Sequence, residues 1–469
     1  MKTLLLNLPK NIDNCFDYDQ VAQPIGLAMI SAAMKHEFLD VVLFDAHAYH
    51  LKRKEILHLI RNEQADIIGF SVMSYQYPQV ISLVKDIKRI FPKIIVVLGG
   101  PHIGADYSAV MRKNPEIDIA VRGEGEYIMP QIVKSLSEGY SLKGVKGIAF
   151  KKDSEIIITE QPEYIFDLDA LPYPDWESLP VKRYWDVFTT RKNYARILGT
   201  RGCPYQCSFC GAHIIMGKKY RKRSPMHVIG ELKMLYDYYH VREILFNDST
   251  FNIDNEWVSE ICEGIIKMGH PIIWRCNVRA DRLDKEILKL MKRSGCVKVV
   301  MGVESGDENV LKLMNKGENL EQIYKGMEML KELKMPSDHG FILGMPGETI
   351  NSLKNTINLA CSVKSGIVTF SLATPFPGTQ LYAYAQKEEG FSVEDWSKFD
   401  FFGAPYITKS LSKEQLLFYY RQALKKIYLR PMYLIRRLLE IKSFINLKIH
   451  LWYTFRIIKR RFSLAYFKK

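Results

Sequence analysis

The chain of 469 residues has no uninterrupted apolar run long enough to span a bilayer, which excludes a membrane-spanning protein. Its first apolar run, residues 3–8, is too short for a signal peptide and ends at Pro9. It also lacks a disulfide framework, because its eight cysteines are scattered apart from one triplet. These absences predict a protein of the reducing cytoplasm.

An acidic excess is absent as well. The net charge is +14, and fifteen Lys and Arg against two Glu between residues 413 and 469 account for +13 of it. Hydrophobic residues at 47% and charged residues at 25% are typical of globular proteins. The length predicts two or three domains, with the basicity concentrated in a C-terminal region.

The most informative pattern is the spacing Cys203-x-x-x-Cys207-x-x-Cys210. Three thiolates on one short loop suit three corners of a four-iron cluster, because soft sulfur ligands favour iron–sulfur centres. No neighbouring cysteine supplies a fourth ligand, so one iron would stay open for chemistry. A zinc site completed by His213, and three unconnected cysteines, are the alternatives.

Residues 1–140 alternate short apolar runs with amphipathic stretches, which predicts an α/β domain with a doubly wound parallel sheet. Three carboxyl ends of the expected strands are small or polar, and glycine there allows a ligand to approach the backbone closely. These ends include Ser71 and Ser74, Gly99-Gly100-Pro101, and Gly123-Glu124. The expected strands are 3–8, 41–44, 66–71, 94–98 and 117–121.

Residues 141–192 read as a proline-rich connector, and residues 193–380 repeat strand and helix six times. Six units predict a partial (β/α)6 barrel of the TIM type, with functional residues at the carboxyl ends of its strands. The expected strands are 195–198, 243–246, 272–276, 298–301, 338–342 and 367–372. Residues 381–469 are expected to form a helical, basic C-terminal region.

Several barrel-lip residues have plain structural alternatives. Glu348 suits the first turn of a helix, where a carboxylate stabilises the helix dipole. Asp248 suits a helix cap, Arg279 a salt bridge at the lip, and Cys276 a small apolar position.

The cysteine spacing, with Phe209 just before Cys210, resembles the radical S-adenosylmethionine (SAM) superfamily. Over residues 1–440 the order of segments resembles its cobalamin-dependent members. The resemblance implies a [4Fe-4S] cluster on Cys203, Cys207 and Cys210 that cleaves SAM to a 5′-deoxyadenosyl radical. It implies further that SAM contacts Phe209, that its ribose and carboxylate contact Arg279, Glu304 and Ser305, and that Ile342 and Gly344 carry its adenine.

The N-terminal domain resembles the cobalamin-binding domain that precedes many radical SAM enzymes. The resemblance implies that cobalamin contacts Ser71, Ser74, Gly99, Gly100, Pro101, Gly123 and Glu124. An Asp-x-His-x-x-Gly motif, which would supply an axial histidine, is absent after the first strand. Asp45-Ala46-His47 follows the second strand and has His50 where the motif has glycine, so we expect cobalamin to bind without a protein histidine.

The family pattern implies methylation of an unactivated carbon of a small-molecule or lipid-like substrate, with a flavodoxin or ferredoxin as electron donor. Oxidative cyclisation is one alternative. An RNA-modifying, methylthiotransferase-like enzyme is another, although only Cys15 precedes Cys203 where that family needs three cysteines. A non-enzymatic corrinoid or iron–sulfur binding protein is the third.

The basic, aromatic C-terminal region allows three interpretations. It suits peripheral contact with the anionic inner face of a membrane, since cationic and aromatic side chains combine there. Binding of nucleic acid is less favoured. The remaining interpretation is a helical lid whose apolar face packs on the barrel.

Overall fold

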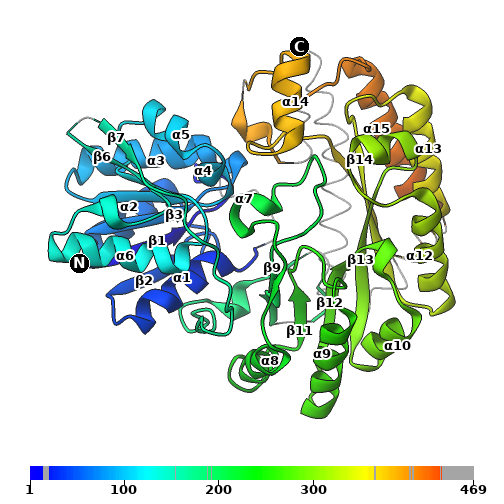
Figure 1. Ribbon diagram of the computed structural model, residues 1–469, viewed down its shortest axis with the longest axis horizontal. Coiled ribbons are helices and arrows are strands. Elements are labelled where there is room, and N and C mark those ends of the chain that lie inside the picture. Colours follow the sequence, from blue (N-terminus) through cyan, green and yellow to red (C-terminus); the bar gives the residue numbers. More distant parts are fainter. Residues whose placement is uncertain are drawn as a thin grey trace.

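The computed structural model describes residues 1–435 except 14–20, 154, 187–188, 192, 364–365, 394, 401–402, 404–405, 432 and 434. Two mainly parallel sheets lie next to each other, each with helices along its faces (Figure 1). This arrangement confirms the predicted α/β class with a doubly wound domain followed by a partial barrel.

The N-terminal sheet has the strand order β2-β1-β3-β4-β5-β6-β7. Strands β1 to β5 are parallel, whereas β6 pairs antiparallel with both β5 and β7. Its strands are β1 (Thr3–Asn7), β2 (Val41–Asp45), β3 (Ile67–Ser71), β4 (Ile95–Gly99), β5 (Ile119–Val121), β6 (Ile148–Lys152) and β7 (Glu155–Ile158). Its helices are α1 (Ile25–His36), α2 (Arg53–Glu63), α3 (Tyr77–Ile90), α4 (Pro101–Ala105), α5 (Tyr107–Lys113) and α6 (Gly125–Glu138).

Both faces of this sheet are buried. In β1, Leu5 belongs to a core with residues of α1 and α6, whereas Leu4 and Leu6 belong to a second core with residues of α2 and α3. Successive side chains of a strand point to opposite faces, so a continuous apolar run is what a strand covered on both sides needs.

Strands β6 and β7 lie inside the segment expected to be a connector. Their isoleucines extend the N-terminal sheet by an antiparallel hairpin, whose lysines and glutamates hid the strand pattern in the sequence. The irregular connector is therefore shorter than residues 141–192.

The second sheet has six strands in the order β15-β14-β13-β12-β11-β8, and all neighbouring pairs are parallel. Strands β8 and β15 stand at its two edges, so the barrel is open. The strands are β8 (Tyr194–Ile197), β11 (Glu243–Phe246), β12 (Ile273–Val278), β13 (Cys296–Glu304), β14 (Ser337–Leu343) and β15 (Val368–Leu372). The helices are α8 (Pro225–Tyr239), α9 (Asn255–Met268), α10 (Lys285–Arg293), α11 (Glu308–Leu313), α12 (Leu320–Glu332) and α13 (Ile350–Ser362).

All six barrel helices begin at side chains that cap them. In the order α8 to α13, the residues that accept a hydrogen bond from the first-turn backbone are Ser224, Asp254, Asp284, Asp307, Asn319 and Thr349. Such caps satisfy amides that have no partner within the helix, so the polar turns between barrel units also define where each helix starts.

The C-terminal region contains α14 (Gln380–Glu389) and α15 (Lys413–Tyr428). Helix α15 buries Leu416, Leu417 and Tyr420, and the Tyr428 hydroxyl donates a hydrogen bond to the Val368 carbonyl of β15. This part of the region therefore packs on the barrel. Residues 436–469, the rest of the predicted basic tail, lie outside the described residues. Among the residues that the structure describes, no helix is both long and apolar enough to cross a membrane.

Candidate cofactor site between the two domains

The cysteine loop leaves the barrel after β8, where the TIM-type arrangement places functional residues. It passes through a short ribbon of β9 (Thr200–Arg201) with β10 (Arg221–Lys222) and continues into α7 (Ala212–Met216). Gly202, at φ +78°, opens the loop, and a Cβ there would lie 2.1 Å from the Lys219 carbonyl oxygen. Only glycine fits this turn without a backbone shift.

The barrel and the C-terminal region hold the loop in place. The Ser208 amide donates to the Met314 carbonyl over 2.8 Å, and the Leu381 amide donates to the Ser208 carbonyl over 2.8 Å. Buried Asp248 accepts hydrogen bonds from the Thr200 hydroxyl and the Gly199 amide. Asp248 therefore fastens the start of the cysteine loop instead of capping a helix.

The three thiols are half-buried, and they are not disulfide-bonded. Burial raises the pKa of Cys207 to about 11 and raises the pKa of Cys210 as well. Lys316 and Arg279 lie near enough to oppose the rise at Cys207. A metal ligand must be a thiolate, and iron would provide the positive charge that this partly buried site lacks. The donor set and its surroundings fit an iron–sulfur cluster.

The zinc alternative needs His213 beside the three thiols. Within the described ranges, no group of three His, Cys, Asp or Glu side chains is close enough to hold a single metal ion. His213 instead lines a cavity between the domains.

A group of charged side chains lies next to the cysteines. Lys316 Nζ is 3.6 Å from Glu304 Oε1 and 3.2 Å from Glu318 Oε2; Lys316 and Glu318 are buried, and Glu304 is partly buried. Burial raises the pKa of Glu304 against the opposing effect of Lys316. Burial by itself would lower the pKa of Lys316, but the nearby carboxylates of Glu304 and Glu318 hold this pKa above its ordinary value. The sequence analysis missed Lys316 and Glu318, because both lie beyond the strand ends it considered.

Arg279 belongs to the same group. It forms a salt bridge with Asp281 over 2.9 Å, and its guanidinium carbon lies 3.5 Å from the ring centroid of Tyr205 on the cysteine loop. The lip salt bridge, the structural alternative for Arg279, is therefore present, and contact with SAM stays a prediction. The guanidinium also holds the cysteine loop through its stacking on Tyr205.

Glu304 has an unusual backbone for a carboxylate residue. It lies at φ +66° beside a register shift between β13 and β14, and a Cβ on Gly302 would lie 2.2 Å from its Oε1. Bulges at strand ends re-aim side chains, and left-handed backbone is costly for a residue with a Cβ. The β13 end is thus built to aim this carboxylate at Lys316.

The predicted SAM-contacting residues divide into two sets. Phe209 and Ile342 pack against one apolar cluster, which supports a shared shelf for an adenine. Gly344, at φ +92°, ends β14, and its amide donates to Glu348 Oε2. Ser305 lies elsewhere: it is fully buried and its hydroxyl is hydrogen-bonded to Thr356 of α13. Ser305 thus has a partner inside the fold, and its contact with SAM stays a prediction.

Glu348 precedes α13 and its cap Thr349, so it does not lie in the first turn of the helix, where the sequence suited it. Its Oε2 accepts hydrogen bonds from the Gly344 and Met345 amides, so it fastens the turn after β14 before α13 begins. Burial raises its pKa to about 8. Cys276 is fully buried, in keeping with a small apolar role.

The predicted cobalamin contacts also divide. Ser71 is exposed, and Gly99, Gly100, Pro101 and Gly123 are half-exposed at the carboxyl edge of the N-terminal sheet. Gly100 lies at φ +91°, and a Cβ there would lie 2.5 Å from the Val72 amide nitrogen. These positions offer backbone and one hydroxyl to a large ligand, and exposed Met73 adds an apolar side chain that the sequence analysis did not select.

Ser74 and Glu124, two of the predicted cobalamin contacts, have partners within the protein, and their contact with cobalamin stays a prediction. Ser74 is buried and its hydroxyl is hydrogen-bonded to His102 Nδ1 over 3.1 Å. Glu124 is 5% exposed and has both oxygens bonded to arginines of the second domain, Arg201 and Arg221. His47, already judged a poor axial ligand, follows β2.

Glu124 instead belongs to a buried ion network across the domain boundary. Arg201, two residues before Cys203, bonds Glu124 over 2.7 Å and Glu126 over 2.6 Å, and Arg221 bonds Glu124 over 2.7 Å. The two arginines are partners in the β9–β10 ribbon, so the two glutamates neutralise like charges placed side by side. The network joins the start of α6 to the start of the cysteine loop.

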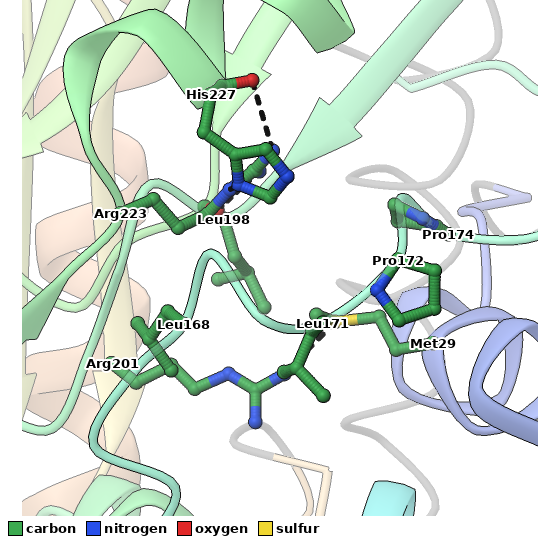
Figure 2. Close-up of a pocket in the computed structure, with 9 residues that line it drawn as sticks. All are labelled: Met29, Leu168, Leu171, Pro172, Pro174, Leu198, Arg201, Arg223 and His227. Carbon is green, nitrogen blue, oxygen red and sulfur yellow. Dashed lines mark hydrogen bonds between the residues drawn. The ribbon is translucent and has the colours of Figure 1, made fainter. Parts of the chain in front are cut away.

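The connector covers this junction. Figure 2 shows Leu168, Leu171 and Pro172 beside Arg201 of the barrel and Met29 of α1, around a void of about 10 Å³. Such a void holds about one water molecule. The connector therefore contacts both domains at this junction.

Comparison with known proteins agrees with this geometry. Residues 14–133 match the B12 binding domain, and residues 197–360 match the Radical SAM superfamily. An anaerobic magnesium-protoporphyrin IX monomethyl ester cyclase of Rubrivivax gelatinosus is 28% identical, over 81% of this chain and 68% of its own length.

Among solved structures, the cobalamin-dependent S-adenosylmethionine radical enzyme OxsB with aqua-cobalamin bound has the same fold. Its TM-score is 0.74 at 18% identity, over 99% of this chain and 72% of that one. An uncharacterised methyltransferase of Pyrococcus horikoshii is 31% identical over 90% of this chain and 91% of its own length. The B12-binding match precedes the radical SAM match along the chain, and the Pyrococcus horikoshii relative covers both. The protein therefore belongs to the radical SAM enzymes that carry an N-terminal B12-binding domain.

Proposed function

We propose that this protein methylates an unactivated carbon of a small molecule, using SAM and cobalamin. The observation that carries the proposal is the position of the two predicted cofactor edges. Helix α4, which starts at Pro101 on the cobalamin edge, packs against α7, which follows Cys210: a Cβ on Gly104 would lie 3.2 Å from Ile215. Both lie between the two sheets in Figure 1. A substrate between the domains can therefore be close to both cofactors.

When bound, the cluster with SAM supplies a radical and cobalamin supplies a methyl group. The chain's own residues position these groups. Cys203, Cys207 and Cys210 are the cluster ligands in this proposal, and Phe209 with Ile342 provides the adenine shelf. Lys316 provides a cation for the SAM carboxylate, and Glu304 provides a carboxylate for the ribose hydroxyls or the amine.

The cobalamin site in this proposal uses Ser71 and the backbone of Gly99, Gly100, Pro101 and Gly123. The sequence between β1 and α1 contains no histidine, so no axial histidine comes from this loop. Open backbone at a parallel sheet edge accommodates a large ligand without one. Arg201 and Glu124 contribute by holding the two domains together.

Oxidative cyclisation is the second candidate, because a cyclase is among the relatives. The same two cofactor edges serve both reactions, and the substrate decides between them. A small-molecule substrate fits the enclosed position between the domains. A lipid-like substrate, a flavodoxin or ferredoxin as electron donor, and a cytoplasmic location at the membrane face remain predictions from the sequence.

The test uses protein purified without oxygen and reconstituted with iron, sulfide and hydroxocobalamin. We expect a corrinoid spectrum, release of 5′-deoxyadenosine from SAM on reduction, and transfer of label from methyl-labelled SAM to a component of cell extract. The Cys203→Ala, Cys207→Ala and Cys210→Ala variants should lose iron and SAM cleavage. Cys361→Ser, a free cysteine at the end of α13, is the matched control.

Each part of the proposal fails separately. Absence of the corrinoid spectrum would exclude cobalamin, and absence of 5′-deoxyadenosine would exclude radical chemistry. If SAM is cleaved and the product contains a new ring but no label from the methyl group, the reaction is cyclisation and not methylation.

A further inference from the structure

A cavity of about 450 Å³ lies between the two domains, on the side of α4 and α7. Gly104 and Ala105 of α4 and Arg122 after β5 line it from the first domain. His213, Lys218 and Lys219 line it from the second. Its volume is that of a small-molecule site, and it exists only when the domains are together.

The lining is positively charged. Arg122, Lys218 and Lys219 line it with His213, and none of the ten lining residues is Asp or Glu. Among the residues that the structure describes, neither Arg122, Lys218 nor Lys219 has an ion pair with a carboxylate. By contrast, Arg201, Arg221 and Arg279 near the site are all paired with carboxylates.

The three cations have only weak partners. Arg122 lies 5.8 Å from the ring centroid of Tyr107, and Lys219 Nζ lies 4.4 Å from that of Phe166. Lys218 Nζ donates to the Gln206 side chain on the cysteine loop over 3.3 Å. Lys218 and Lys219 are exposed and Arg122 is half-buried, and both domains contribute to this set of cations. An anion that enters the cavity would find positive charge that no carboxylate of its lining compensates.

Glycine gives the cavity its shape. Gly217 lies at φ +72°, where a Cβ would lie 2.6 Å from the Tyr164 ring, and Gly378 lies at φ +80° with a Cβ position 3.0 Å from Ile214. Side chains at these positions would force the walls apart or fill the space, so the small residues keep the cavity open beside α7.

We infer that the substrate is an anion, a carboxylate- or phosphate-bearing small molecule held in this cavity by Arg122, Lys218 and Lys219. The inference rests on the proposed function, since it assigns the substrate class for that reaction. The cavity wall begins three residues after Cys210, at His213, and Lys218 is bonded to Gln206 of the cysteine loop. An anionic group here places the remainder of the substrate next to that loop.

Pyrophosphate serves as the probe, because it presents several negative charges and has no carbon to be methylated. The reconstituted holoenzyme should bind it saturably in calorimetry against sodium chloride of equal ionic strength. The double variant Arg122→Gln, Lys219→Gln should raise the Kd at least tenfold. Lys54→Gln, Lys85→Gln removes the same charge from exposed positions on α2 and α3 and should leave the Kd unchanged. No saturable binding, or equal loss in both double variants, would overturn the inference.

A second arm separates the substrate from the phosphate of the cobalamin nucleotide tail. If the cavity holds substrate, cobalamin and cobinamide, which lacks that phosphate, should bind the double variant as they bind the wild type. The contrary outcome is that the double variant binds cobalamin more weakly than the wild type does while cobinamide binding is unchanged. If pyrophosphate also competes with cobalamin, the cavity belongs to the cofactor and the inference is overturned.

The third arm needs no variant. The methyl-labelled product from cell extract should be retained on an anion-exchange resin at neutral pH, and a neutral product would contradict the inference. Pyrophosphate binding does not depend on turnover, so failure of the methylation proposal and failure of the anion site are distinguishable.

Discussion

At the scale of single residues, some polar side chains at strand ends are bonded within the protein and others are open to solvent. Glu124 and Ser305 are polar residues at strand ends, as ligand-binding residues often are, yet both are buried and fully bonded within the protein. Ser71 stands at an equivalent strand end and is exposed. Burial with complete hydrogen bonding argues for structure, because a ligand would have to break those bonds.

Lys316 gives a prediction at this scale. Replacing it with Gln removes the cation between Glu304 and Glu318, and we expect the KM for SAM to rise at least tenfold, the loss of one charge-assisted contact. Lys316→Arg should restore part of the affinity. Iron content and the cobalamin spectrum should not change, which separates SAM binding from loss of the fold. Lys325→Gln on α12, with an exposed side chain, is the control, and an unchanged KM in both variants would refute the role.

Glu348 gives a pH prediction. Its pKa is raised to about 8 by burial, so folding favours the protonated form. The stabilisation is fully present below the unfolded pKa and is lost as the pH rises through the folded pKa. This group alone should lower the free energy of unfolding by about 2 kcal/mol between pH 6 and pH 8.

Urea unfolding of wild type and Glu348→Gln at both pH values checks this. Glutamine keeps the acceptor for the Gly344 and Met345 amides without titrating. The difference in stability between the two proteins should therefore shift by that amount in favour of the variant at the higher pH. A difference that does not change with pH would show that Glu348 is ionised in the folded protein.

At the scale of elements, the β9–β10 ribbon connects the cysteine loop to the first domain. The ribbon has only four residues in strand conformation and gains its stability from outside itself, through Glu124 and Glu126 of the α6 start. A two-stranded ribbon is marginal alone in water, so these ion pairs position the loop. These ion pairs are buried in the domain interface, so removal of one charged partner leaves the other charge buried and unpaired.

Glu124→Gln tests this coupling. Because both arginines stay buried, we expect a loss of about 3 kcal/mol or more in the free energy of unfolding. We also expect a urea transition that separates into two steps, because the domains lose a shared anchor. Glu37→Gln removes the exposed ion pair with Lys134 in the same domain and should leave the free energy of unfolding almost unchanged, because solvent screens that pair. Equal effects of the two variants would contradict a special role for the network.

At the scale of the whole molecule, two sheets place one cofactor edge each toward a shared boundary. The first domain contributes the Ser71 and Gly99–Gly100 edge, and the barrel contributes the cysteine loop. The connector and the Glu124 network hold them together, and α15 closes the outside of the barrel next to Gly344. A reaction that needs two cofactors depends on this relation more than on either domain alone.

The basic region beyond the described residues gives a whole-molecule prediction. Residues 436–469 carry ten Lys and Arg against one Glu. A protein ending at residue 435 retains α15 with its barrel contacts, so its circular dichroism and iron content should match those of the full chain. Only the full chain should sediment with vesicles of anionic lipid at low salt, and 0.5 M salt should release it. No sedimentation of the full chain at low salt would exclude membrane contact.

The sequence by itself determined the order of most elements and predicted the cluster ligands, because both depend on short-range patterns. A strand buried on both faces needs a continuous apolar run, and three thiols on one loop need only close spacing. These patterns were sufficient for the doubly wound sheet and the six-stranded barrel, and they predict Cys203, Cys207 and Cys210 as the ligands. The β6–β7 hairpin was not predicted from the sequence, because its charged residues interrupt the apolar pattern of a buried strand.

Only the tertiary structure decided which polar residues pair within the protein and which line a cavity. Arg201 and Glu124 are 77 residues apart in the sequence, and nothing local distinguishes that pair from any other arginine and glutamate. The same holds for Lys316 beside Glu304, and for Arg122 and Lys219, which meet at one cavity from two domains. Attraction between charges depends on distance and burial, and both are properties of the folded chain.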